Sequence, residues 1–131
     1  MLLFLVHNLI VLLLLAEQNA ASFAMFGETK QKQQDRWHRD NVLLNVAAVL
    51  PLLLHNLSDW AWLIGGALLL RTALFDLAFN YFAKLRTNYI GSTAGLDKIF
   101  RKIFGIYGAI RKSVVFLLLL LILITLYYIV G

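Results

Sequence analysis

The sequence contains no cysteine and a single proline in 131 residues. The absence of cysteine excludes disulfide bonds, thiolate metal sites, iron–sulfur clusters and cysteine nucleophiles. Charged residues are also scarce at 15%, whereas 61% of the residues are hydrophobic, compared with roughly 45–50% in soluble domains. A chain of this length forms one domain at most, and a soluble core of that size cannot cover so much apolar surface. The composition therefore predicts an integral membrane protein.

Several classes of function lack the motifs that they require. Three histidines are too few for a histidine-rich di-iron desaturase or hydroxylase. Neither a Gly-x-Ser-x-Gly nucleophile elbow nor a Gly-x-x-x-x-Gly-Lys phosphate loop is present. The net charge of +5 does not indicate nucleic acid, because the basic residues lie between apolar runs rather than on a soluble module. We expect no nucleic-acid partner, and the sequence identifies no cofactor.

Four apolar stretches approach or reach the roughly 20 residues needed to cross a hydrocarbon core about 30 Å thick. They are residues 2–26, 42–57, 60–82 and 114–130. The first lacks the positive N-terminal region of a signal peptide, so we expect it to be retained as a span. The second is short. Pro51 in its middle removes a backbone hydrogen bond, which predicts a kink with the freed carbonyl of Ala47 facing protein.

The basic residues indicate how the four spans are oriented, because Lys and Arg concentrate in cytoplasmic segments. Eleven of the twelve basic residues lie between the first and second spans or between the third and fourth. We therefore expect a multi-pass protein of the bacterial inner (cytoplasmic) membrane with both termini on the outer side. Residues 1–131 are expected to form a single helical membrane domain.

Residues 94–112 carry apolar side chains at helical spacing, from Leu96 to Ile110, with basic residues on other faces. This pattern predicts a helix lying on the anionic cytoplasmic leaflet, where each nearby basic residue contributes on the order of 1 kcal/mol. The residues expected to bind anionic phospholipids are Lys98, Arg101, Lys102, Arg111 and Lys112. The alternative is a helix packed on other protein with its charges solvated. The predicted fold is all-α: an integral membrane protein with four transmembrane helices and one cytoplasmic interfacial amphipathic helix.

Polar residues inside the spans need partners, because unpaired polar groups are costly in hydrocarbon. Three polar residues of the third span are spaced four apart and form one polar stripe, Thr72, Asp76 and Asn80. Glu17 is the only acidic residue in the other spans, and its depth lies within about 8 Å of Arg71 at 1.5 Å per residue. We therefore predict a buried Glu17–Arg71 ion pair. Asp76 is expected to be hydrogen-bonded within the stripe or to His38.

Carboxylates and an imidazole near the cytoplasmic interface are candidates for acid–base catalysis or for binding a divalent metal. The candidate catalytic residues are Glu17, His38, Asp40 and Asp76. His38-x-Asp40 is a pattern that often arises by chance, and the sequence favours the alternative in which His38, Arg39 and Asp40 cap the second span and bind lipid headgroups. The pattern assigns no metal site.

A motif occupies the middle third of the chain, Arg71-x3-Phe75-Asp76-x3-Asn80, then Tyr89-Ile90-Gly91-Ser92-Thr93 and Asp97. The motif resembles a pattern in small uncharacterised polytopic membrane proteins of bacteria and their phages. The resemblance implies a four-span organisation and a role for Arg71, Asp76 and Asp97. It implies no particular reaction.

Three functions remain open from the sequence. The first, which we expect, is a structural or accessory component of a membrane complex, with the bilayer and other membrane subunits or further copies of the chain as partners. The second is a membrane-embedded metal-dependent or acid–base enzyme acting on lipid-like substrates at the cytoplasmic interface. The third is a pore or lysis factor of the holin type, which fits the size of the chain but lacks the usual charged C-terminal tail.

Overall fold

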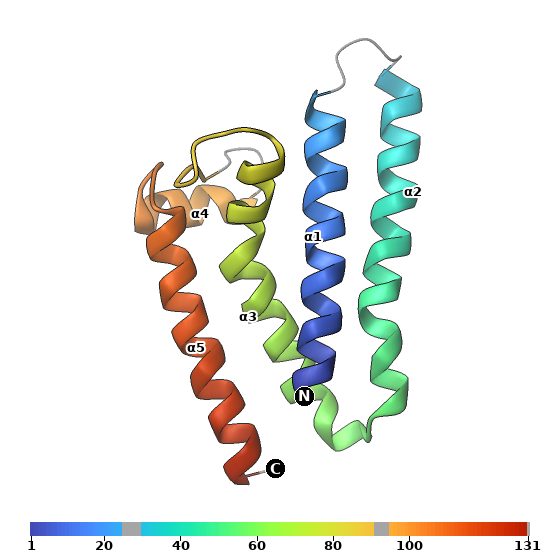
Figure 1. The fold of residues 1–131 in the computed structure, drawn as a ribbon, viewed down its shortest axis with the longest axis vertical. Coiled ribbons are helices and arrows are strands. Elements are labelled where there is room, and N and C mark those ends of the chain that lie inside the picture. Colours follow the sequence, from blue (N-terminus) through green and yellow to red (C-terminus); the bar gives the residue numbers. More distant parts are fainter. Residues whose placement is uncertain (25–29, 91–94, 131) are drawn as a thin grey trace.

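The structure of the protein is a computed structural model that describes residues 1–24, 30–90 and 95–130, with no side-chain description for residues 22–38. Every long regular element in these residues is helical (Figure 1). The elements are α1 (Leu2–Ala24), α2 (Lys30–Val49), the 3-10 helix η1 (Leu50–Leu54), α3 (Leu57–Phe82), α4 (Gly95–Phe104) and α5 (Ala109–Val130). The all-α prediction is confirmed for this part of the chain.

Four long helices run side by side, and the short helix α4 lies across one end of them (Figure 1). Helix α1 packs against α2 and α3, and α3 packs in turn against α5. The chain direction alternates from α1 to α2 to α3, and then again at α5, so both termini lie at the end opposite α4. The packing therefore centres on α1 and α3, and α5 is attached mainly through α3.

Three of the helices are long and apolar enough to cross a membrane. They are the Leu2–Ala21 part of α1, all of α3 and all of α5. These helices correspond to three of the four predicted spans, although residues 25–26 of the first prediction lie outside the described residues. Their length and composition show the class of the molecule: it is a membrane protein.

The second predicted span differs most from the structure, because α2 begins far upstream in a polar sequence and ends at Val49. Pro51 lies in the first turn of η1 rather than in the middle of a continuous helix. Proline lacks a backbone N–H and clashes with the preceding turn, so it ends α2 here instead of kinking it. The freed carbonyl of Ala47 accepts a hydrogen bond of 2.7 Å from His7 Nε2, which confirms that this group faces protein.

The predicted interfacial helix of residues 94–112 is interrupted in the structure, with residue 94 outside the described part. Helix α4 ends at Phe104, and Gly105 has a φ of +85°, a conformation that glycine adopts without strain. Gly108 also has no room for a side chain, since a Cβ there would lie 2.2 Å from the Phe104 carbonyl oxygen. A new helix, α5, begins at Ala109. The prediction of one helix through residue 112 is therefore wrong, because two glycines allow a sharp turn.

Candidate functional site

A buried ion pair joins α3 to the first turns of α5. Lys112 Nζ donates a hydrogen bond to Asp76 Oδ2, and the two side chains are only 3% and 13% exposed. The ammonium group also lies 4.7 Å from the centre of the Phe100 ring, which comes from α4. A cation over an aromatic face is attracted to the electrons of the ring. The lysine therefore contacts groups from two other helices at once.

Asn80 closes the same end of α3 with a second set of polar contacts. Its side chain is 1% exposed, and its Nδ2 donates to the carbonyl oxygens of Thr87 at 3.0 Å and Tyr89 at 2.7 Å. The Asn80 carbonyl accepts a bond from the Leu85 amide at 2.9 Å. A loop that folds back over a helix end exposes backbone groups that must be satisfied. The side chain of Asn80 satisfies two of these groups, and its backbone carbonyl satisfies a third.

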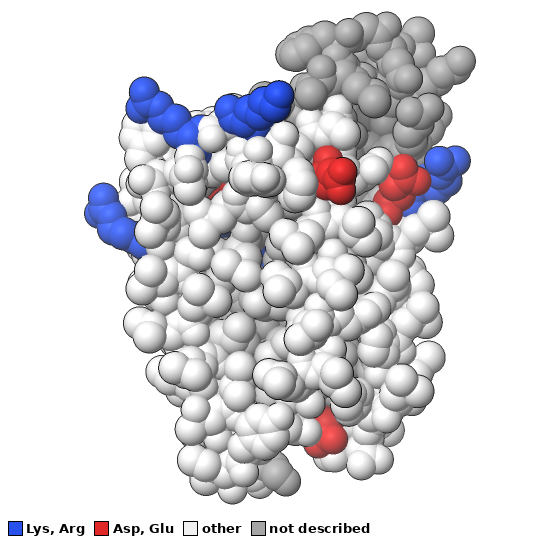
Figure 2. All heavy atoms as spheres, viewed as in Figure 1, with Lys and Arg blue, Asp and Glu red and all other residues white. Residues whose placement is uncertain are grey.

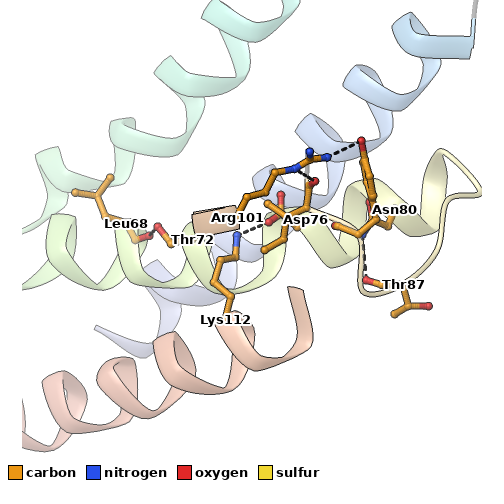
Figure 3. A network of polar contacts seen from close by, with 9 residues as sticks. Leu68, Thr72, Asp76, Asn80, Thr87, Arg101 and Lys112 are labelled. Carbon is orange, nitrogen blue, oxygen red and sulfur yellow. Dashed lines mark hydrogen bonds and ion pairs between the residues drawn. The ribbon is translucent and has the colours of Figure 1, made fainter. Parts of the chain in front are cut away.

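Arg101 binds the same loop from α4. Its Nε donates to the carbonyl oxygen of Ile90 at 2.8 Å, and its Nη2 donates to the Tyr89 hydroxyl at 3.0 Å. The Ile90 side chain is fully buried, and its amide donates to the carbonyl oxygen of Ile106 at 3.0 Å. Figure 3 shows the resulting network, in which α3, the loop and α4 are joined through polar atoms and α5 is joined through Lys112.

Thr72, Asp76 and Asn80 do lie four residues apart on α3, as the stripe requires, but each binds a different partner. Thr72 donates to the Leu68 carbonyl within its own helix at 2.8 Å, while Asp76 binds Lys112 rather than another member of the stripe. Lys112 was predicted to bind lipid headgroups, and its burial against Asp76 corrects that expectation. The reason is its place in α5 rather than in α4: the two helices run in different directions (Figure 1), and Lys112 is among the buried residues of α5.

Arg71 and Glu17, the predicted ion pair, are not joined among the described residues. Arg71 Nη1 instead donates to Asn45 Oδ1 at 2.8 Å, and the guanidinium lies 5.8 Å from the Phe75 ring centre. Glu17 is exposed and lines a different hollow with Asp40. Counting residues gives how far along its helix each side chain lies, but not the direction in which it points around the helix axis. Arg71 points toward α2.

The candidate catalytic residues do not converge on one place in the described part of the chain. Glu17 and Asp40 line a shallow hollow between α1 and α2, where Gln18 donates to Asp40 at 2.9 Å. Asp76 is engaged by Lys112, and the side chain of His38 is outside the described residues. Within the described residues, no three His, Asp or Glu side chains gather in a group that could hold a metal ion.

The lysine and arginine side chains drawn in blue in Figure 2, which shows the described residues of one face, gather toward the α4 end of the molecule. Lys98, Lys102 and Arg111 are exposed, as the lipid-binding prediction requires, whereas the guanidinium of Arg101 is held by the Tyr89–Ile90 loop. The opposite end has Asp59 in the first turn of α3. Charge is therefore unequally distributed between the two ends of the bundle.

A pocket of about 230 Å³ lies among α1, α2, η1 and α3, on the side of the molecule away from α5. Its polar lining comes from Asn8, Asn45 and Arg71, and the other lining residues are apolar. Sequence reasoning missed this pocket, because it depends on how far α2 diverges from α3. It also missed the Asp76–Lys112 pair, for which the only available signal was that a buried carboxylate requires a cation.

Comparison with known proteins identifies no relative. No protein-family model matches the chain, and neither curated proteins nor solved structures match it. The resemblance of the Arg71–Asn80 motif to small phage and bacterial membrane proteins therefore stays a prediction.

Proposed function

We propose that the chain is a four-span component of a bacterial cytoplasmic membrane with both termini outside, acting as a structural or accessory subunit of a membrane complex. The observation that carries the proposal is the unequal distribution of charge: basic residues gather at the α4 end, and acidic Asp59 lies at the other. Basic ends of membrane helices remain in the cytoplasm. The resemblance to polytopic phage and bacterial proteins agrees with this organisation.

The direction of the helices supports a second crossing by α2 and η1. Helices α1 and α3 run the same way along the bundle (Figure 1), so a chain in which both cross the bilayer must return between them. Residues 42–54 provide about 22 Å of apolar helix at about 1.5 Å per α-helical and 2.0 Å per 3-10 residue. This length is below the thickness of the hydrocarbon core, and local thinning of the bilayer accommodates the difference.

The proposal also gives α4 a role as an interfacial helix. Leu96, Ile99 and Ile103 are exposed to 65%, 53% and 65%, an arrangement unfavourable in water but suited to the acyl boundary of a leaflet. Lys98 and Lys102 are exposed beside them. An interfacial helix with free basic groups attaches the cytoplasmic end to anionic lipid.

An enzyme is less well supported than an accessory subunit. Acid–base or metal chemistry needs its groups within hydrogen-bond or ligand distance of one substrate. Asp76 is neutralised by Lys112, and Glu17 and Asp40 line a separate hollow. The buried polar groups instead join helices to one another, as expected for a protein whose role is to hold a shape.

The second crossing is tested by labelling single cysteines in the intact protein, since the chain has none of its own. Ser58→Cys and Arg39→Cys lie on either side of the proposed second crossing, residues 42–54, and both positions are exposed. With a membrane-impermeant maleimide, Ser58→Cys is expected to react in intact cells and Arg39→Cys only after permeabilisation of the inner membrane. Arg86→Cys is the matched cytoplasmic control. Equal labelling of Ser58→Cys and Arg39→Cys before permeabilisation contradicts the four-span arrangement.

The accessory role is tested by purifying the protein in mild detergent and identifying the proteins that remain bound. A defined stoichiometric partner, or a stable assembly of copies, is the expected result. Metal analysis of the same preparation distinguishes the metal-dependent enzyme alternative from the accessory role. A monomer that holds a stoichiometric divalent metal argues for that alternative and against the accessory role.

A further inference from the structure

Arg71 lies deep in a helix that is long and apolar enough to cross a membrane. About 16 Å of helix separate it from Phe82 at the α4 end, at 1.5 Å per residue. A guanidinium at this depth requires either water or a group of opposite charge. Among the described residues its hydrogen-bond partner is the amide of Asn45, which is neutral, and no carboxylate pairs with it.

The surroundings of Arg71 form a pocket rather than a packed contact. Apolar side chains of α1, α2, η1 and α3 line most of it. Val49 and Leu68 of the lining are themselves 52% and 59% exposed, so the pocket is open along the flank of the bundle. In a membrane, that flank faces lipid.

The polar groups of the pocket are already oriented. Asn45 Nδ2 donates to the Asn41 carbonyl at 2.8 Å, which turns its Oδ1 toward Arg71. Asn8 Nδ2 donates to the carbonyl oxygens of Phe4 at 3.0 Å and Ala48 at 3.3 Å. A guanidinium has five N–H donors in a planar fork that matches a carboxylate or a phosphate. Arg71 lines the pocket, and its single hydrogen bond to Asn45 leaves further N–H donors of the guanidinium without a partner among the described residues.

We propose that this pocket binds an anionic amphiphile, whose carboxylate or phosphate oxygens accept hydrogen bonds from Arg71 while its acyl chain lies against the apolar lining. The inference goes beyond the accessory role and depends only on the molecule being in a membrane. Charge complementarity selects the headgroup, because an anion neutralises Arg71 and a zwitterionic headgroup brings its own cation. The apolar lining and the opening toward lipid select an amphiphile over a free anion.

A second copy of the chain is the competing occupant, through its exposed Glu17. The observations favour lipid, since Glu17 is beside Asp40 and Gln18 in the hollow between α1 and α2, and lies about 10 Å of helix from the end of α1. A carboxylate so near that end reaches cytoplasmic water by itself. Arg71 has the deeper, unpaired charge.

The test uses the full chain with one introduced cysteine, Leu68→Cys, which lines the pocket one helical turn from Arg71. The cysteine receives a fluorophore, and the protein is reconstituted in phosphatidylcholine vesicles that contain an equal mole fraction of one spin-labelled quencher. The quenchers are phosphatidylcholine, phosphatidic acid and an ionised fatty acid. We expect both anions to associate at this site about five to ten times more strongly than phosphatidylcholine, equivalent to about 1–1.4 kcal/mol. A preference for only one of them identifies the headgroup as phosphate or carboxylate.

Controls separate the pocket from general lipid contact. Leu121→Cys, 60% exposed on α5, is expected to show no preference between headgroups. In the Leu68→Cys protein, Arg71→Gln is expected to reduce the preference to about one, while Arg111→Gln, an exposed basic change outside the pocket, leaves it intact. Arg71→Lys keeps the charge without the fork and is expected to retain part of the preference, which also covers the case in which Arg71→Gln fails to fold.

Several results overturn the proposal. Equal quenching by all three lipids at Leu68→Cys, both in the parent protein at every protein density and in the Glu17→Gln background, excludes a selective site. A preference that survives Arg71→Gln shows that Arg71 is not its cause. A preference that is absent until the protein is diluted to one copy per vesicle, and that appears on Glu17→Gln, shows that a second copy occupies the pocket instead.

Discussion

Replacing Lys112 with methionine removes the cation from a pair that is almost fully buried, with side chains 3% and 13% exposed. Methionine has a similar length and no charge, so the change tests charge with little change in volume. Asp76 is then left as a carboxylate without its partner inside the protein. Removing one partner of a buried pair costs about 3–5 kcal/mol. We expect Lys112→Met and Asp76→Asn each to lower the free energy of unfolding by this amount.

The double variant separates an ion pair from two independent contributions. With both charges gone, no buried charge is left unpaired, and such replacements are often close to neutral. The double variant is therefore expected to be more stable than either single variant, with a coupling energy of about 2–3 kcal/mol. Loss of the Lys112 contact with the Phe100 ring, 4.7 Å away, is expected to leave a residual cost of about 0.5–1 kcal/mol.

Unfolding of the reconstituted protein in mixed micelles of increasing denaturing detergent, followed by far-ultraviolet circular dichroism, measures these differences. Arg111→Met is the matched control, because Arg111 is adjacent in sequence and exposed; its effect is expected to lie within about 0.5 kcal/mol. The reasoning is refuted if the two single changes add in the double variant, or if Lys112→Met is as harmless as Arg111→Met.

Three further predictions concern the α4 end. Asn80→Leu removes both side-chain hydrogen bonds to the carbonyls of Thr87 and Tyr89 and is expected to lower the free energy of unfolding by about 2–4 kcal/mol. Proteolysis at residues 84–90 should become faster in this variant. Thr87→Ala, at an exposed position, should leave the cleavage rate unchanged. Gly108→Ala places a Cβ 2.2 Å from the Phe104 carbonyl oxygen. The change is expected to lower the free energy of unfolding by about 1–3 kcal/mol and the thermal midpoint by several degrees. The control is Gly95→Ala, where a Cβ meets nothing within 4 Å, and an equal shift in both contradicts the argument. A peptide of residues 95–112 is expected to bind anionic vesicles more tightly than neutral ones, and added salt should weaken the binding through screening; equal and salt-insensitive binding leaves hydrophobicity alone as the cause.

Three of the predicted spans were predictable because the information for them is local. Residues 60–82 and 114–130 are long, predominantly apolar stretches, and each lies inside one helix, α3 or α5. The freed carbonyl of Ala47 was predictable for a similar reason, since the effect of Pro51 acts over one helical turn. The sequence prediction underestimated how strongly proline and glycine terminate a helix. Pro51 ends α2, and Gly105 with Gly108 ends α4.

The partners of the charged residues within the helices were not predictable, because they depend on rotation of the helices about their axes. A count of residues gives the depth of Arg71 and Glu17 but not the directions in which they point. Arg71 meets Asn45 on α2, and Glu17 points to the hollow between α1 and α2. Lys112 was grouped with its basic neighbours in the sequence. The turn at Gly105–Gly108 places it in a different helix from Lys98 and Lys102.

The two ends of the bundle are held together by different physical effects, and this difference bears on how the protein acts. Near the termini, α1, α3 and α5 approach closely at Gly66, where an added Cβ would meet Met1 and Leu5 at 3.0 and 3.1 Å and Leu123 at 3.5 Å. Close backbone approach at small residues is the usual packing of helices in lipid, where apolar burial itself gives no driving force. At the α4 end, an ion pair joins α3 to α5, and hydrogen bonds join α3 to the loop that follows it.

The contacts at the α4 end are directional, so they fix rotation and register where packing alone does not. That end also carries the exposed basic residues of α4. Helix α4 is connected to the rest of this end through Arg101, which binds the carbonyl oxygen of Ile90, and through Phe100, whose ring contacts Lys112 of α5. Helix α5 packs mainly on α3, so its position depends on the Asp76–Lys112 pair at one end and on the packing at Gly66 at the other.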